Sequence, residues 1–527
     1  MSKKHTSLHI MWYRRDLRIS DNDALHHATK GGEPCIGVFI IDEWFFKQPE
    51  ISEVRVHFLF ESLQSLAKNF KAKGGQFYIV QGSSSKKVIE LLEKTRELGS
   101  KPKLFFNRDM QVIYGQKRDQ AIDSYVFDNN ISLYKGRRAF LQVENNDYDN
   151  WIVEYYQYQS SEAFPVPEKI ISSPLSERLM SYFKIIKPED LHSWAEQWGV
   201  VTRQGGQFTG GEREAHRLVR TFAKERYSGY HWKLSRPYLA QVGATSHLSP
   251  HLTFGTISSR TVNQTLYSRK QELKGTNPKG VLSIASFLDR LRWCDSFAQR
   301  LWFHPEIMWQ NRFPEFNEVY TDEPLNTEKQ QLFDAWCNGT TGFPLLDASM
   351  RHLNEDGWMN FRMRAQAATM LTIIFGVSWH HGARYFMQKL VDGDIAINHW
   401  QWQMQAGVTN PLSKTFRIYN PTKNLQTKDP DLKYVHHWLP EMRKHKTIED
   451  VLLHAKPIID YSQARKINGK IISDIRKVVR ERIAAEKGIE LRDATTAKKT
   501  VENYNKRTNA RYKKATQEQF LFDEADK

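Results

Sequence analysis

Cysteine is scarce in this chain of 527 residues, which contains only Cys35, Cys294 and Cys337. Three widely spaced cysteines give neither a disulfide framework nor a zinc-binding pattern, so we expect a reducing compartment. A four-cysteine cluster in the C-terminal part is excluded, because no cysteine follows residue 337. The N-terminus lacks an apolar signal segment and no uninterrupted apolar run reaches 18 residues, so we expect a soluble cytoplasmic protein.

Common nucleotide and metal motifs are also missing. No G-x-G-x-x-G follows the first predicted strand and no G-K-[ST] occurs, so neither dinucleotide nor Walker-type binding is supported. The adjacent histidine pairs lack both i,i+4 spacing and a cysteine partner, as at His26–His27, His380–His381 and His436–His437. Asp392 and Asp394 lack further oxygen ligands at loop spacing. We therefore expect no bound metal.

Positive charge and aromatic rings are plentiful. The formal net charge is +16 and the pI is near 9.4, which favours association with polyanions such as DNA, although a generally basic protein would look the same. The 15 Trp, 21 Tyr and 29 Phe residues supply mostly core, and they also offer stacking surfaces for bases or flat ligands.

The first 137 residues alternate apolar strand-like runs with helix-like segments. "SLHIMWY", "PCIGVFIID", "QFYIVQG" and "KLFFN" are the strand candidates, and amphipathic segments with cap residues separate them. This alternation predicts a Rossmann-like α/β domain with a parallel sheet and helices on both faces.

The remainder of the chain changes character twice. Residues 138–204 are polar and rich in proline, which predicts a long inter-domain connector. Residues 205–485 are helical in pattern, with almost no strand-like alternation, and predict an all-α domain. Residues 486–527 are rich in lysine and poor in large apolar residues, so we expect a marginal helix or a disordered tail.

Several ordered stretches resemble one family. "MWYRRDLRISDNDAL" (11–25), "GATSHLSPHLTFGTIS" (243–258), "GFPLLDASMRHLNEDGWMNFRMR" (342–364) and "FRIYNP" (416–421) resemble the photolyase/cryptochrome family in order and spacing. The resemblance covers roughly residues 8 to 445. It implies an N-terminal antenna domain, a helical domain that binds FAD, and DNA as the partner.

A loop before a predicted helix matches the family's flavin-phosphate contacts, which implies this role for Thr245, Ser246, Leu248 and Ser249. Small hydroxyl side chains just before a helix suit diphosphate oxygens. Ordinary N-capping by Ser or Thr is the alternative explanation.

Four residues match positions that surround the flavin ring. Arg364 and Asp392 match a pair that packs against the ring, although a plain buried salt bridge would give the same pattern. Asp394 matches a contact to the ribityl chain and ring edge. Asn398 matches the position facing flavin N5, where photolyases usually carry Asn, plant cryptochromes Asp and animal cryptochromes Cys. A neutral amide there favours repair over signalling.

Two tryptophans match an electron-transfer chain. Trp402 matches the member nearest the flavin and Trp379 the middle member, whereas the distal position is Asn326. The sequence leaves four candidates for the distal role, namely Trp302, Trp309, Trp336 and Trp400. Core packing is the alternative role for any single Trp.

The lesion pocket departs most from the family. Trp293 matches the aromatic wall beside a flipped-out pyrimidine dimer, and Arg362 keeps its family position at this pocket. The companion Trp is Met404 here, and the usual Glu or Gln is Arg290. The Arg that follows the wall residue is Cys294. These departures resemble a divergent bacterial branch of the family.

Other positions concern the lesion type and the DNA backbone. Asn360 and Phe361 replace the usual His-Asn, so the histidine pair that 6-4 enzymes need is missing. Arg417 and Lys414 match a loop that contacts DNA phosphates, with a solvated charged face as the alternative.

The leading hypothesis is light-dependent repair of cyclobutane pyrimidine dimers by electron transfer from excited, reduced FAD to a flipped-out lesion. The alternatives are a blue-light photoreceptor that binds FAD without repair, a 6-4 photolyase, and a nucleic-acid-binding protein whose flavin site has decayed. We expect a monomer without an obligate protein or membrane partner. An antenna chromophore (folate, deazaflavin or flavin) is typical of the family, and these residues do not choose among them.

Overall fold

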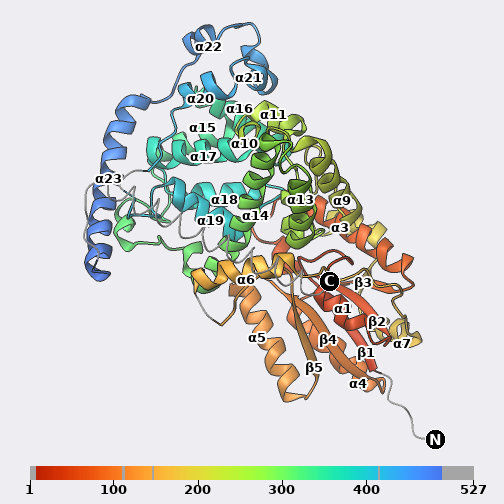
Figure 1. Ribbon diagram of the computed structural model, residues 1–527. Helices are drawn as coiled ribbons and strands as arrows, with labels where there is room; N and C mark the ends of the chain where they lie inside the picture. Colours follow the sequence, from red (N-terminus) through yellow and green to blue (C-terminus); the bar gives the residue numbers. More distant parts are fainter. Residues whose placement is uncertain (1–6, 110–112, 145–146, 414–415, 489–527) are drawn as a thin grey trace, which may run out of the picture.

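The computed structural model describes residues 7–109, 113–144, 147–413 and 416–488 (Figure 1). An α/β domain occupies one end of the molecule, and a larger helical domain occupies the other (Figure 1). The predicted fold class, α/β plus all-α, is confirmed.

The α/β domain is built on a six-stranded sheet with the order β5-β4-β1-β2-β3-β6. The strands are β1 (Ser7–Tyr13), β2 (Cys35–Ile41), β3 (Gln76–Gln81), β4 (Lys101–Arg108), β5 (Ser132–Arg137) and β6 (Ile185–Ile186). The pairings among β1 to β5 are parallel, and β6 pairs antiparallel with β3.

Alternating side chains of β1 explain why helices cover both faces of the sheet. Leu8, Ile10 and Trp12 point to the core shared with α4 (Ser84–Glu97) and α5 (Ile113–Asp128). Met11 and Tyr13 point to the opposite core, shared with α1 (Asp23–Thr29) and α3 (Glu53–Ala72). Both faces are apolar because a sheet covered on both sides has no solvent-facing side.

The segment expected as a connector contains regular structure that the sequence did not predict. It forms α6 (Tyr148–Ser160), α7 (Pro174–Met180), β6 and α8 (Leu191–Gln197). Strand β6 escapes sequence-based detection because two residues are too few to show a period of two. Helix α6 lies along the boundary between the two domains and packs against α13 (Ser259–Glu272) (Figure 1).

The helical domain follows, and its packing places α17, α18 and α19 at its centre (Figure 1). Besides α13, its main helices are α9 (Glu212–Thr221), α12 (Ser249–Phe254), α14 (Pro278–Phe303), α15 (Thr327–Asn338), α16 (Pro344–Asp356), α17 (Phe361–Thr369), α18 (Trp379–Lys389), α19 (Ile395–Gln405), α20 (Pro421–Lys428), α21 (Lys433–Trp438), α22 (Ile448–His454) and α23 (Tyr461–Glu486). Its shorter helices include α10 (Tyr230–Lys233) and α11 (Pro237–Leu239), and a further short helix, α2 (Glu43–Phe46), belongs to the α/β domain.

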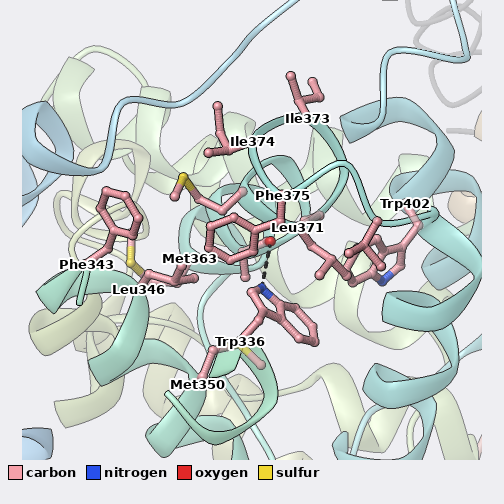
Figure 2. Packing of buried hydrophobic residues seen from close by; sticks show 14 of the residues in the cluster. Trp336, Phe343, Leu346, Met350, Met363, Leu371, Ile373, Ile374, Phe375 and Trp402 are labelled. Atoms are coloured by element: carbon pink, nitrogen blue, oxygen red, sulfur yellow. Dashed lines mark hydrogen bonds between the residues drawn. The ribbon is translucent and has the colours of Figure 1, made fainter. Parts of the chain in front are cut away.

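The core of this domain is dense in aromatic and sulfur-containing side chains. Figure 2 shows Trp336, Met363, Leu371 and Trp402 packed together between α15, α17 and α19. Among the helices that the structure describes, none has the length and apolarity required to cross a membrane. Helix α23 ends at Glu486, and residues 489–527 of the expected tail lie outside the described residues.

Candidate flavin and DNA site

The loop Asp392–Asp394 that precedes α19 is held by two arginines of the α/β domain. Arg55 of α3 donates hydrogen bonds to the carbonyls of Gly393 (3.1 Å) and Met387 (2.8 Å). A Cβ at position 393 would lie 2.3 Å from the Arg55 Nη1, so a larger residue there would displace the guanidinium from its contacts. Arg15, which follows β1, donates from Nη1 to the Asp394 carboxylate at 2.8 Å. The two domains therefore meet at this loop.

Arg15 is itself held in place by ion pairs within the α/β domain. The Asp109 carboxylate accepts two hydrogen bonds from Arg15 (2.7 and 2.8 Å) and one from Arg138 (3.0 Å). Burial alone would raise the pKa of Asp109, but the neighbouring arginines hold it well below its usual range. Arg138 also donates to the carbonyls of Leu252 and Thr253, both at 2.7 Å, at the end of α12.

The pair Arg364 and Asp392 is formed as the sequence predicts. Arg364 Nη2 donates to Asp392 Oδ2 at 2.9 Å, while its Nε donates to the Met359 carbonyl at 2.8 Å. The Asp392 side chain is 4% exposed and that of Arg364 is 26% exposed. Asp392 Oδ1 is buried and has no hydrogen-bond partner. A buried carboxylate oxygen without a partner is costly, which indicates a polar ligand at this position.

Helix α19 presents Asn398 and Trp402 from one face, one turn apart. The Asp394 side chain caps this helix by accepting a hydrogen bond from the Ile397 backbone N–H (3.2 Å). Asn398 is buried, and its Nδ2 donates to the Ala383 carbonyl at 3.0 Å, so the orientation of its amide is fixed. The Trp402 ring lies against α18 at Gly382, where a Cβ would approach it to 2.2 Å.

The predicted phosphate loop lies immediately before α12. Arg226 donates to the Thr245 carbonyl at 2.5 Å, and the Ser246 hydroxyl accepts from the Leu248 backbone N–H at 3.3 Å. Leu248 is the N-cap residue of α12, and no side chain forms a cap hydrogen bond there. Local bonding by Ser246 therefore accounts for one backbone N–H of this loop, and the assignment of the loop to diphosphate stays a prediction.

Trp379, the predicted middle member of the electron chain, is fully buried at the start of α18. Its ring stacks on His380 with a centroid distance of 3.8 Å and meets His399 of α19 at 6.1 Å. Its Nε1 donates to Asn311 Oδ1 at 2.7 Å. Trp402 has a different set of ring neighbours, with Phe386 at 4.9 Å and Trp336 at 6.0 Å.

The predicted lesion face exposes aromatic rings flanked by cations. Trp293 of α14 is 51% exposed and Phe361 of α17 is 42% exposed. The guanidinium groups of Arg290 and Arg362 lie 5.4 and 4.9 Å from the Phe361 ring. Arg362 also donates to the Tyr419 hydroxyl at 2.7 Å. Cations and exposed rings in alternation are the pattern that stacks bases and neutralises phosphates.

The other residues predicted from the sequence are Met404, Arg417, Lys414 and Cys294. Met404 is half-buried on α19, and Arg417 is exposed. Lys414 lies outside the described residues. Cys294 is close to the flavin loop: burial raises the pKa of its thiol to about 12, and the nearby carboxylates of Asp295, Asp394 and Asp392 add to that rise. A reactive thiolate is therefore not expected there.

One cluster of potential metal ligands occurs among the described residues, at His445, Asp450 and His454. Asp450 accepts hydrogen bonds from Nδ1 of His445 (2.9 Å) and is 3.1 Å from Nδ1 of His454. The same His454 nitrogen lies 2.9 Å from the Asp450 carbonyl, so hydrogen bonding within α22 accounts for the arrangement. No metal is assigned to it.

Comparison with known proteins adds independent findings. Residues 9–143 match the family model "DNA photolyase", and residues 287–480 match "FAD binding domain of DNA photolyase". The chain belongs to the photolyase/cryptochrome family. A deoxyribodipyrimidine photo-lyase of Alkalihalophilus pseudofirmus is 27% identical to it over 496 residues, covering 87% of this chain and 96% of the relative.

Two solved structures show the same photolyase/cryptochrome fold. A cryptochrome of Synechocystis superposes with a TM-score of 0.74 at 22% identity, covering 89% of this chain and 100% of that one. An archaeal photolyase from Sulfolobus tokodaii, described with two FAD molecules, gives a TM-score of 0.72 at 24% identity, covering 89% and 99%.

The region matched by the FAD-binding domain model contains Arg364, Asp392, Asp394 and Asn398, and we refer to these four residues as the candidate flavin wall. The unpartnered Asp392 oxygen, the fixed Asn398 amide and the loop before α12 fit a flavin with its diphosphate. Sequence reasoning missed Arg15 and Arg55 as supports of this wall. Arg15 lies in the motif R-R-D-L-R at 14–18, which carried part of the family resemblance, but its partner Asp394 is 379 residues away.

Proposed function

We propose that this protein is a light-driven DNA lyase that splits cyclobutane pyrimidine dimers with reduced FAD. The observation that carries the proposal is the proximity of two surfaces. Arg364 of the flavin wall and Arg362 of the aromatic, cationic face lie two residues apart on α17. Helix α14, which bears Trp293, packs against α19, which bears Asn398. A flavin held at this wall and a base stacked on that face would therefore be supported by the same helix, α17, and by the packed pair α14 and α19.

The chain contributes position and electrostatics to this reaction. FAD, when bound and fully reduced, supplies the electron that light transfers to the lesion. Arg364, Asp392 and Asp394 would hold and orient the flavin, and the Arg364 cation favours the anionic reduced ring. Asn398 offers N5 a neutral amide in a fixed orientation, which adds no proton source. No side chain is required as a general acid or base.

Damaged DNA is the proposed partner. Arg417 and Lys414 would contact phosphates, and the basic character of the chain predicts a strong dependence of binding on salt. A cyclobutane dimer pairs poorly, so flipping it from the duplex costs less than flipping an intact base. Trp293 and Met404 would flank the flipped dimer, with Arg290 and Arg362 at its edge. We place this activity in the cytoplasm, in a monomer.

A 6-4 photolyase is disfavoured, because Asn360 and Phe361 occupy the positions where those enzymes need histidines for proton transfer. A photoreceptor without repair activity is the second candidate. Its support is the altered lesion face, with Arg290, Cys294 and Met404 in place of the usual residues.

We also propose that the α/β domain binds a second, light-harvesting chromophore. The archaeal relative described with two FAD molecules makes a flavin one candidate, beside folate and deazaflavin. Extraction of the purified protein and identification of the released pigments by mass spectrometry would separate the three.

The test of the main proposal uses chemically reduced holoprotein, blue light and two oligonucleotides, one with a cyclobutane dimer and one with a 6-4 product. The proposal predicts restored thymines from the first and none from the second. Restoration of the 6-4 product alone would contradict our interpretation of the lesion face. Failure with both, by a protein that retains photoreducible flavin, would favour the photoreceptor.

A further inference from the structure

The distal position of the predicted electron chain carries no redox-active side chain. Asn326 is exposed, and its Oδ1 accepts a hydrogen bond from the Lys329 backbone N–H (2.9 Å) as the N-cap of α15. An electron chain from Trp402 through Trp379 therefore needs another surface residue. That residue must accept an electron from an external reductant in solvent. Four tryptophans are available by sequence, and the structure separates them.

Trp336 lies closest to Trp402, and the structure argues against it as an exit. Its side chain is 0% exposed, and its Nε1 donates to the Ala367 carbonyl at 3.0 Å (Figure 2). An oxidised Trp336 can neither meet a reductant from solvent nor release its N–H proton to water. The Trp336 ring packs against the rings of Phe386 and Tyr385, which indicates a structural role in the core.

Trp400 and Trp302 are unsuitable for other reasons. The Arg300 guanidinium lies 4.8 Å from the centre of the buried Trp400 ring, and a fixed cation opposes a second positive charge on that ring. Trp302 packs in a small separate cluster with Phe297 and Ile307, and its Nε1 donates to the Val143 carbonyl at 3.4 Å.

Trp309 differs from the other three, because its loop contacts both Trp379 and the neighbouring His380. The Trp309 carbonyl lies 3.3 Å from His380 Nε2, and the His380 ring stacks on Trp379. Two residues later, Asn311 Oδ1 accepts the Trp379 N–H at 2.7 Å. The Trp309 side chain itself is 41% exposed. Among the four candidates it alone combines an exposed ring with a loop that contacts both Trp379, through Asn311, and the His380 ring stacked on Trp379.

The geometry points to Trp309 as the surface end of the electron chain that photoreduces the flavin, in the order Trp402, Trp379, Trp309. This inference rests on the proposed function, since it concerns how FAD reaches its reduced state. Each event moves one electron. An external thiol would donate the electron to Trp309 and be oxidised; Trp309 would donate to Trp379, and Trp379 to Trp402. Trp402 would supply the electron to the flavin when that group is bound.

The charges around Trp379 are compatible with this route. His380 and His399 both contact its ring, and burial lowers the pKa of each to about 4. Both imidazoles are therefore neutral at pH 7 and do not repel a transient positive charge on Trp379. No guanidinium or ammonium group faces the Trp309 ring within the described residues.

The test measures photoreduction directly. Oxidised holoprotein in a thiol buffer is illuminated with blue light, and the loss of oxidised flavin absorbance is followed in the wild type and in Trp309→Phe, Trp302→Phe and Trp336→Phe. We expect about a tenfold slower photoreduction in Trp309→Phe and a change of less than about twofold in the other two variants. Transient absorption should show a long-lived tryptophan radical that only Trp309→Phe shortens.

Photoreduction of Trp309→Phe at the wild-type rate would overturn the inference, as would an equal slowing in Trp336→Phe. Flavin content and the thermal midpoint of each variant control for misfolding, and Trp302→Phe controls for loss of a partly exposed Trp. Repair by chemically reduced wild-type protein is measured separately. Its absence would reject the proposed function without deciding the route, which the photoreduction rates decide alone.

Discussion

The two sides of the site differ in how their residues are held. On the flavin side, Asp392, Asp394 and Asn398 are buried or nearly so, and each is fixed by identified hydrogen bonds. On the proposed lesion side, Trp293 and Phe361 are exposed, and the Phe361 ring lies near the guanidinium groups of Arg290 and Arg362. Two arginines from the other domain reinforce the flavin side, whereas the lesion side is built within the helical domain.

This difference explains why the flavin side keeps the residues typical of its family and the lesion side does not. A buried hydrogen-bond network tolerates few substitutions, because any unpaired polar group costs free energy. An exposed stacking surface tolerates Arg290 and Met404 more easily, since flat rings and cations act without strict geometry. The departures from the family pattern therefore fall among the proposed substrate contacts, at Arg290 and Met404, and not among the proposed cofactor contacts.

The largest effect is expected at the flavin wall. Asp392→Ala leaves Arg364 without its carboxylate, so flavin should be lost on purification, and the free energy of unfolding should fall by about 3 kcal/mol. That value is at the lower end of such effects because Arg364 retains some solvent contact. Flavin absorbance per chain and urea unfolding check it. Asp322→Ala, which breaks the exposed pair with Arg384, should change neither.

The next largest effect is expected in the pH dependence of stability, at Asp295, a buried residue of α14 two positions after Trp293. Burial raises the pKa of Asp295 to about 7, and the Asp394 carboxylate adds to the rise. The folded protein keeps a proton that the unfolded chain releases above about pH 4, so stability from this group falls as pH rises towards 7. Asp295→Asn should therefore gain about 3 kcal/mol of unfolding free energy, relative to wild type, between pH 5 and pH 8.

Urea unfolding at several pH values measures this difference. Asp289→Asn is the control on the same helix, since Asp289 is exposed and should leave the pH profile as it is. Equal pH profiles for Asp295→Asn and the wild type would show that Asp295 is ionised in the folded protein.

A smaller effect is expected on the lesion side. Trp293→Ala removes a stacking surface worth about 1–3 kcal/mol, so the Kd for dimer-containing DNA should rise about tenfold or more. Flavin content should stay at the wild-type level, because this ring is exposed. Fluorescence anisotropy with damaged and intact oligonucleotides measures the change. The control is Trp198→Ala, at the end of α8 in the α/β domain, which should bind DNA as the wild type does. A loss of flavin in Trp293→Ala would show that Trp293 also supports the cofactor and would contradict the separation of the two sides.

The smallest effect is expected at the phosphate contact. Arg417→Ala should weaken binding of damaged and intact DNA equally, and should reduce the slope of log K against log salt by about 0.9. Lys101→Ala, at the start of β4 and far from the helical domain, serves as the charge-matched control (Figure 1). A loss confined to damaged DNA would assign Arg417 to lesion recognition instead.

Much of this organisation can be predicted from sequence, for identifiable reasons. The parallel strands are long apolar runs, and the flavin residues cluster in short motifs such as Asp392–Asp394 with Arg364. Residues far apart in sequence escape detection: Arg55 and Arg15 reach the flavin loop from 338 and 379 positions away. Trp309 is one of many tryptophans by sequence, and only the folded loop brings its carbonyl to His380 and its neighbour Asn311 to Trp379. Strand β6 was too short to detect.

The most direct test of the central claim is light-dependent repair. Chemically reduced protein with bound FAD is mixed with an oligonucleotide carrying one cyclobutane thymine dimer and illuminated with blue light, and restored thymine is measured against a dark control. The account predicts restoration in the light and none in the dark. An intact dimer after illumination, with flavin still bound and reduced, would contradict it.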